Sequence, residues 1–125
     1  MNVSIGIVVP TRNRVSQIVA LLETFCDSSL RPAQIVIVAS GQDIQQSIEM
    51  FYNKLNLTYV YTEIVGQVAQ KSLGIEHLNP NIDWCLFSDD DLLFSKDALE
   101  EAIKAKEKFG EEILGIGFSY QQLHE

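Results

Sequence analysis

The sequence predicts a single α/β domain in which a mainly parallel β-sheet carries helices on both faces. Short, almost wholly apolar runs alternate along the chain with longer segments whose apolar residues recur at helical spacing. Continuous apolar strands are typical of parallel sheets, because crossover helices bury both faces of such sheets. The length of 125 residues suits one domain with one core.

The first half of the chain is expected to begin with a central strand. Residues 3–9 form a β-branched run that is expected to stop at Pro10. Residues 16–25 carry apolar side chains at helical spacing and predict a helix. Residues 34–39 follow Pro32 and are again almost wholly apolar, so we expect a second buried strand there.

A turn at residues 41–43 separates this strand from the next elements. Asp43 is predicted to cap a helix that runs to Leu55. Its inward side chains are expected to be Ile44, Ile48, Phe51 and Leu55. Residues 57–62 alternate in polarity and are rich in β-formers, as an edge strand would be. Residues 65–78 predict a helix with these core positions: Val68, Ala69, Leu73 and Ile75.

Three elements are predicted in the last third of the chain. Residues 83–87 are expected to form another buried strand. Residues 96–109 predict a charged amphipathic helix that ends at Gly110, a natural C-cap. Residues 113–118 predict a last strand, and exposed apolar surface near it could drive the formation of a homodimer.

Charge and cysteine content exclude several classes of protein. The formal net charge of −8 argues against a nucleic-acid partner, because phosphate backbones require clustered Lys and Arg. No apolar run is long enough to cross a bilayer and no signal peptide is recognisable. We therefore expect no transmembrane segment and a cytoplasmic location, with peripheral membrane attachment as the alternative. Cys26 and Cys85 lack metal-ligand spacing and are expected to be buried, reduced thiols.

An acidic run, Asp89-Asp90-Asp91, follows Ser88 directly after the apolar residues 84–87. This order places carboxylates where a strand ends, and ligands of open α/β sheets bind at the carboxyl ends of the strands. Adjacent carboxylates repel one another, so a cation is expected to neutralise them, and oxygen ligands suit Mg²⁺ or Mn²⁺. The alternative is a solvated turn whose acids cap the helix that follows.

Four segments, in order and at sensible spacing, resemble family-2 glycosyltransferases of the GT-A type. Residues 8–14 resemble the opening strand and loop of that family, and residues 34–38 resemble its second strand. Residues 66–74 resemble the helix that precedes the family's DxD region, and residues 84–91 resemble that region itself. The resemblance implies a Rossmann-like fold and transfer of a sugar from a nucleotide-diphospho-sugar donor, of the UDP or GDP type. It also implies Mn²⁺ or Mg²⁺ on the diphosphate.

The resemblance suggests roles for the acidic run. One common form of the family carries Asp-Ser-Asp, which sets Ser88 in place of the first acid and makes Asp90 the metal ligand. Asp89 is then expected to face the ribose or a metal-bound water. Aligning the three acids directly with DxD makes Asp91 the ligand instead, so Asp91 is the alternate.

The same resemblance implies that Pro10, Thr11 and Arg12 contact the nucleoside. Lys71 stands where the family often has Arg in an Ala-Arg-Asn stretch, and could approach the base or the diphosphate. For Arg12 and Lys71, a plain exposed side chain is the alternative.

One departure from the family pattern concerns the base. The family usually carries an acid after its second strand, and this chain has Ala39 there. Ser40 or Asp43 could substitute, and the choice of base stays open.

The other departure is length, because the chain stops about one predicted strand after the DxD helix. Residues 1–125 are therefore expected to be a donor-binding half without an acceptor-binding half. Neither the acceptor nor a catalytic base is identified, and the chain by itself is expected not to transfer sugar. A catalytically silent nucleotide-binding module is the first alternative. A nucleotidyltransferase is the second, although the loop at residues 10–13 lacks the glycines expected of one.

Overall fold

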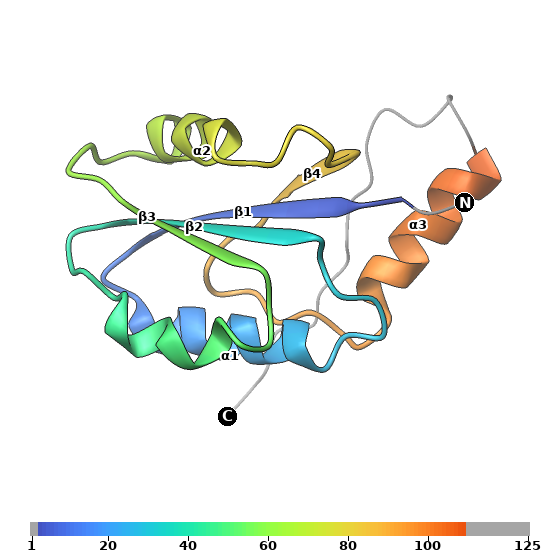
Figure 1. The fold of residues 1–125 in the computed structure, drawn as a ribbon, viewed down its shortest axis with the longest axis horizontal. Coiled ribbons are helices and arrows are strands. Elements are labelled where there is room, and N and C mark those ends of the chain that lie inside the picture. Colours follow the sequence, from blue (N-terminus) through green and yellow to red (C-terminus); the bar gives the residue numbers. More distant parts are fainter. Residues whose placement is uncertain (1–2, 110–125) are drawn as a thin grey trace.

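The structure is a computed structural model, and it describes residues 3–109. The described elements are β1 (Ile5–Arg12), α1 (Val15–Cys26), β2 (Gln34–Ser40), the 3₁₀ helix η1 (Gln46–Phe51), β3 (Leu57–Tyr61), α2 (Gln67–Glu76), β4 (Trp84–Phe87) and α3 (Ala98–Phe109). The strands form one parallel sheet in the order β3-β2-β1-β4 (Figure 1). The predicted α/β fold with a parallel sheet is confirmed.

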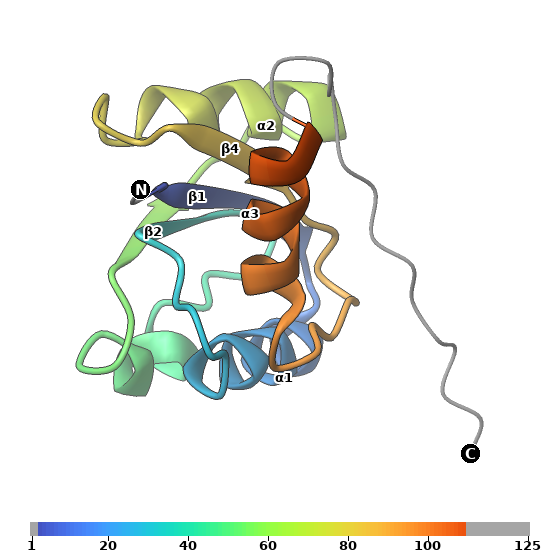
Figure 2. The same cartoon turned by 90° about the vertical axis from the view of Figure 1, so that its right-hand side faces the viewer.

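Helices cover both faces of this sheet. Figure 1 shows α1 on one face and α2 on the other, while α3 runs across the layers from the level of α1 to that of α2 (Figure 2). Side chains of alternate residues in β1 and β2 point to opposite faces of the sheet and pack into two separate cores. The larger core, toward α1 and η1, includes Ile7, Val9, Ile35 and Ile37. The smaller core, toward α2, is built on Val8, Val36 and Val38.

Pro10 lies within β1 and does not end it, so the predicted end of this strand was wrong. The N–H of Ser88 donates to the Val8 carbonyl at 3.0 Å, which shows that Val8 turns its backbone polar groups toward β4. Pro10, two residues on, turns the same way, but β4 ends at Phe87. The position of the missing N–H of Pro10 thus coincides with the end of β4 in the described sheet.

The segment after β2 is compact but less regular than predicted. The expected inward residues are all buried: Ile44, Ile48, Phe51 and Leu55. They are carried by a 3₁₀ helix of six residues followed by turns, and not by one long α-helix. Asp43 does not cap that helix. Its Oδ1 accepts from the Gln45 N–H at 3.1 Å and from the Tyr59 hydroxyl at 2.8 Å, and so closes a turn against β3.

The helix α2 was predicted correctly, but its core face was not. Three expected core residues are exposed: Val68, Ala69 and Ile75. The buried residues are Gln70 and Gly74, with Leu73 half-buried beside them. A Cβ on Gly74 would collide with the side chain of Val8, so glycine is what lets the helix approach β1 closely. This close packing, and not the apolar pattern, sets which face of α2 meets the sheet.

The last described elements also depart from prediction. β4 is an edge strand of the described sheet with alternate residues exposed, whereas a buried strand was expected. Cys85 is therefore an exposed thiol, and Cys26 is half-buried, so the expectation that both are buried was wrong. α3 begins two residues later than predicted. Gly110, the predicted strand at residues 113–118 and its expected apolar surface lie outside the described residues.

None of the helices within residues 3–109 has the length and apolar character required to cross a bilayer.

Candidate functional site

Four segments converge at the carboxyl ends of the parallel strands. The loops after β1, β2 and β3 emerge at the same end of the sheet, and the chain leaving β4 enters the acidic run there (Figure 1). Within open α/β sheets this edge is where ligands bind. The sequence-predicted site residues on β1, β2 and the acidic run therefore lie at one edge of the fold.

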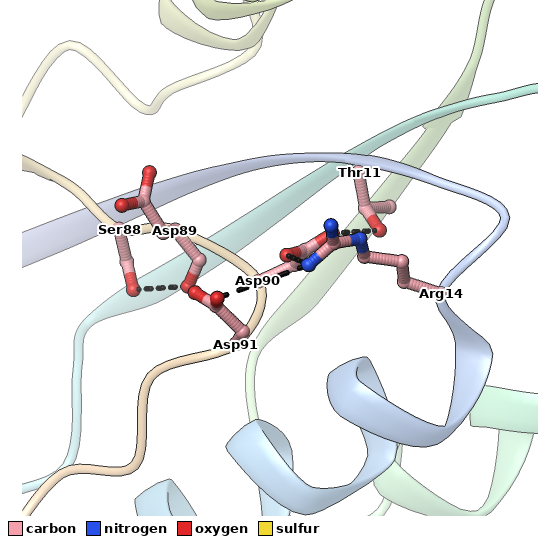
Figure 3. Close-up of polar contacts among 6 residues, drawn as sticks. All are labelled: Thr11, Arg14, Ser88, Asp89, Asp90 and Asp91. Carbon is pink, nitrogen blue, oxygen red and sulfur yellow. Dashed lines mark hydrogen bonds and ion pairs between the residues drawn. The ribbon is translucent and has the colours of Figure 1, made fainter. Parts of the chain in front are cut away.

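Thr11 and Arg14, which belong to the first strand and its loop, hold the middle acid of the run. The Thr11 hydroxyl donates to Asp90 Oδ2 at 2.9 Å, and Arg14 Nη1 lies 3.5 Å from Asp90 Oδ1 (Figure 3). The same guanidinium nitrogen lies 3.8 Å from Asp91 Oδ2. Contacts that span more than 70 residues of sequence thus bring the first loop to the acids.

The three acids sit in different surroundings. The Asp90 side chain is 12% exposed and that of Asp91 is 57% exposed. Asp89 is exposed, and its carboxylate lies on the side away from Arg14 (Figure 3). Ser88 is buried, and its hydroxyl donates to the Asp89 carbonyl at 3.0 Å, which fixes the backbone where the run begins.

Burial raises the pKa of the Asp90 carboxyl above its usual value. The hydrogen bond from Thr11 and the charge of Arg14 lower the same pKa, while the neighbouring charges of Asp91 and Asp89 raise it further. The raised pKa means that desolvation and like-charge repulsion outweigh the stabilisation of the charged carboxylate by Thr11 and Arg14. A further cation at Asp90 would therefore relieve an existing electrostatic cost.

Gln70 is a member of this edge that sequence reasoning missed. Its side-chain amide donates to the Thr11 carbonyl at 3.1 Å and to the Val38 carbonyl at 2.9 Å. Its Oε1 accepts from the Gly66 N–H at 3.2 Å and from the Ser40 hydroxyl at 3.4 Å. The sequence signal that could have identified Gln70 is its position one helical turn before Gly74, which places both residues on the face of α2 that packs on the sheet.

The end of β2 is closed by its own contacts. Ser40, a candidate base contact, is fully buried, and its hydroxyl is donated to Gln70, so its side chain offers no surface to a ligand here. Asn13 Oδ1 accepts the Gln42 N–H at 2.8 Å, which ties the loop after β1 to the loop after β2. Asn13 adopts a φ of 55° and Gly41 a φ of 75°, the left-handed region in which these residue types are tolerated.

Tyrosines of β3 brace the same loop. The Tyr61 hydroxyl donates to the Gly41 carbonyl at 2.7 Å, and the Tyr59 hydroxyl donates to Asp43. Burial and the hydrogen bond to Asp43 raise the pKa of Tyr59 to about 12. Asp43, the other candidate for the missing base-contacting acid, is thus exposed but already engaged.

The remaining predicted nucleotide contacts have mixed exposure. Pro10 and Thr11 are buried, whereas Arg12 is exposed at the end of β1. The Lys71 ammonium lies 5.5 Å from the centroid of the Phe87 ring, a cation–π contact at the end of β4. Lys71 therefore contacts the residue that directly precedes Ser88, where the acidic segment starts.

Residues 3–109 contain no group of three or more His, Cys, Asp or Glu side chains arranged to hold a metal ion by themselves. A divalent ion at this edge would need ligands from elsewhere as well. Mg²⁺ is commonly bound through one or two carboxylates together with substrate phosphates, and Asp90 and Asp91 fit that pattern.

Comparison with known proteins identifies a family whose model matches most of this chain. The model of "Glycosyl transferase family 2" matches residues 6–122. A search of curated proteins found no match.

Solved structures of glycosyltransferases share the fold of this chain. S. aureus TarS 1–349 in complex with UDP-GlcNAc is 22% identical with a TM-score of 0.76, over 94% of this chain and 37% of that one. The mannosyltransferase PcManGT from Pyrobaculum calidifontis, in complex with GDP-Man and Mn²⁺, is 23% identical with a TM-score of 0.72, over 85% and 33%. A second S. aureus TarS structure is 24% identical with a TM-score of 0.73, over 84% and 20%.

The fold is therefore Rossmann-like and of the GT-A type, as the sequence predicted. This chain spans about one fifth to two fifths of the length of these structures.

Proposed function

The chain belongs to glycosyl transferase family 2, and on that premise we propose that it binds a nucleotide-diphospho-sugar donor for transfer of the sugar to an acceptor hydroxyl. The proposed donor site is the carboxyl edge of the sheet. A divalent ion, Mn²⁺ or Mg²⁺, takes part in binding the diphosphate.

The contact between Thr11 and Asp90 is the observation that carries this proposal. It joins the end of β1 to the acidic run through a hydrogen bond of 2.9 Å. A carboxylate that is largely desolvated and already oriented is suited to bind a cation without further ordering. The position also agrees with the register in which Asp90 is the ligand.

The side chains present fit a divalent ion. Asp90 and the exposed Asp91 offer carboxylate oxygens, and the donor diphosphate supplies further oxygens. When bound, the ion neutralises charge on the diphosphate leaving group. We assign Asp90 as the main protein ligand and Asp91 as the second.

Basic residues around this edge are assigned to the anionic donor. Arg14 already lies beside Asp90 and Asp91, so its guanidinium is within reach of a diphosphate placed against these acids. Arg12 and Lys71 flank the same edge from β1 and α2, and we propose that they contact the nucleotide. Asp89, which is exposed and turned away from Arg14, is proposed to face the ribose.

The buried residues of the edge are assigned a different task. Pro10, Thr11 and Ser40 have little exposed surface, so we propose that they shape the nucleoside site through the backbone. The base specificity is then set by exposed groups on the braced loop after β2. The neighbours in structure include complexes with UDP-GlcNAc and with GDP-Man, and both base types belong in the test.

We further propose that residues 1–125 supply the donor-binding part of the activity and that the acceptor site is built by residues outside this stretch. The small share of the structural neighbours' length that the chain covers supports this division. Positioning of the acceptor and general-base assistance, each worth orders of magnitude in rate, would then come from outside the stretch.

Calorimetry with UDP and GDP, with Mn²⁺ and with a chelator, tests the proposal. We expect one of the nucleotides to bind, and to bind at least about tenfold more tightly with the ion present. Equal binding in chelator would rule out the metal role. Sugar transfer to a defined acceptor by this chain alone would overturn the proposed division, and absence of nucleotide binding would overturn the proposed function.

A further inference from the structure

Gln70 is the most completely bonded buried side chain at the carboxyl edge of the sheet. It is 4% exposed, and its amide makes the four hydrogen bonds described above. A carboxamide has two donor hydrogens and one acceptor oxygen with two lone pairs, so these contacts use its full capacity. A buried polar group satisfied in this way holds its partners in one arrangement.

The partners of Gln70 come from different segments of the chain. The Thr11 carbonyl lies at the end of β1, while the Val38 carbonyl and the Ser40 hydroxyl lie at the end of β2. The Gly66 N–H lies where α2 begins. One side chain therefore ties two strand ends, already paired in the sheet ladder, to the helix that lies over them.

A route of two hydrogen bonds connects Gln70 to the acidic run. Its amide holds the Thr11 carbonyl at 3.1 Å, and the hydroxyl of the same threonine donates to Asp90 at 2.9 Å. The Thr11 backbone is thus fixed on one side while its side chain orients Asp90 on the other. Gln70 itself is buried and has no surface with which to touch a donor.

The opposite end of the sheet contains a matched glutamine. Gln34 is 7% exposed, and its amide donates to the Thr58 hydroxyl and to the His77 carbonyl, each at 2.9 Å. Its oxygen accepts the Asn79 N–H at 2.8 Å. Gln34 ties strands and a helix end together as Gln70 does, but it lies at the amino end of β2, far along the strand from Asp90.

We propose that Gln70 is a positioning residue for the donor site, which acts through Thr11 to hold Asp90 in the orientation that binds the metal-diphosphate group. This inference rests on the proposed function. Loss of the amide leaves the Thr11 carbonyl and the Val38 carbonyl without their side-chain donor. Thr11 stays paired with Ala39 in the sheet ladder, but its backbone loses the tie to α2, and its hydroxyl is no longer held toward Asp90.

Matched substitutions separate positioning from stability. Gln70→Met and Gln34→Met each keep side-chain length and remove every hydrogen bond of one buried amide. Urea unfolding measures the stability of both variants, and calorimetry with Mn²⁺ and UDP or GDP measures the affinity of the folded chain. We expect both variants to lose stability, Gln70→Met to bind about tenfold or more weakly, and Gln34→Met to bind within about twofold of wild type.

A double-mutant cycle with Thr11→Val tests the route. If Gln70 acts through Thr11, Thr11→Val costs much less affinity in the Gln70→Met background than in wild type. Should Gln70→Met not fold, Gln70→Asn, whose amide is one methylene shorter, replaces it under the same criteria.

Equal affinities of the two glutamine variants, or additive effects in the cycle, would overturn the positioning role while leaving the proposed function standing. Absence of nucleotide binding by the wild-type chain would overturn both.

Discussion

The two ends of the parallel sheet each contain a buried glutamine that links strand to helix, but the two ends differ in charge. Gln34 at the amino end and Gln70 at the carboxyl end each cross-link strand and helix through a buried amide. At the amino end, the carboxylate of Asp83 accepts from the N–H and the hydroxyl of Ser4, at 2.9 and 3.2 Å. Neutral partners from the neighbouring strand segment satisfy this acid.

The carboxyl end has more negative charge than its own contacts balance. Asp90 and Asp91 share the guanidinium of Arg14, and burial raises the pKa of Asp90 despite that partner. The comparison teaches that buried amides and paired acids are not by themselves signs of a site. What distinguishes a site is a desolvated charge whose local partners do not compensate it.

The largest expected difference between the ends comes from neutralising one acid at each. Asp90→Asn should weaken Mn²⁺-dependent nucleotide binding by about 10- to 100-fold, because it removes the charge of the assigned ligand. Asp83→Asn should leave that affinity unchanged and cost about 1 kcal/mol of unfolding free energy. Calorimetry and urea unfolding measure the two effects. Comparable losses of affinity in both variants would erase the distinction between the ends.

A smaller effect is expected within the acidic run. Asp91→Asn should reduce metal-dependent affinity by several-fold, less than Asp90→Asn, because the Asp91 carboxylate is 57% exposed and less oriented. The same titrations compare the two variants. If Asp91→Asn proved the more damaging change, the ligand register would be displaced by one residue.

Arg14→Gln should strengthen binding of Mn²⁺ in the absence of nucleotide. The guanidinium lies 3.5 Å from Asp90 and 3.8 Å from Asp91 and repels an incoming cation. Because Arg14 is half exposed, we expect a gain of no more than about fivefold. Free Mn²⁺ measured by electron paramagnetic resonance reports it.

Arg31→Gln is the matched control for that gain. Arg31 carries the same charge and binds the carbonyls of Lys54 and Cys26, just before β2 begins. A gain of equal size in the control would show that net charge, and not the placement of Arg14, sets the affinity.

The smallest expected effect is on the pH dependence of stability. A raised Asp90 pKa means that, between the unfolded and folded values, the folded chain binds more protons than the unfolded chain. The free energy of unfolding should therefore gain a small contribution as the pH falls through that window. Asp90→Asn should lack this contribution. Urea unfolding across the range tests it, and a wild-type contribution of opposite sign would contradict the raised pKa.

Local patterns were enough to predict most strands and the position of the acids. Apolar runs correctly predicted β1, β2 and β4, and the alternating residues 57–62 correctly predicted β3 as an edge strand. Within the described sheet residues 84–87 lie at an edge, which was missed because four apolar residues look alike at an edge and in the centre. The contact from Thr11 to Asp90 depends on β1 and β4 being neighbours, which no local pattern encodes.

The face of α2 shows why periodicity alone was insufficient. Val68 and Ile75 are apolar and 80% and 50% exposed, whereas Gln70 is polar and buried. The close approach of Gly74 to Val8 fixes the rotation of the helix, and that rotation brings Gln70 over the strand ends. A polar residue that satisfies backbone carbonyls thus replaced an apolar one in the core. Ser40, predicted as a ligand contact, was enclosed by the same amide.

Pro10 also determines where the hydrogen-bonded pairing of β1 with β4 ends. The last hydrogen bond between them runs from the Ser88 N–H to the Val8 carbonyl, and the next donor in a parallel ladder would be the N–H of residue 10. Proline has no N–H, so β1 offers no backbone donor to the Ser88 carbonyl. The segment after β4 therefore leaves the sheet before Asp89. The ring of one imino acid thereby sets the length of the neighbouring strand and keeps the carboxylates that follow out of the sheet.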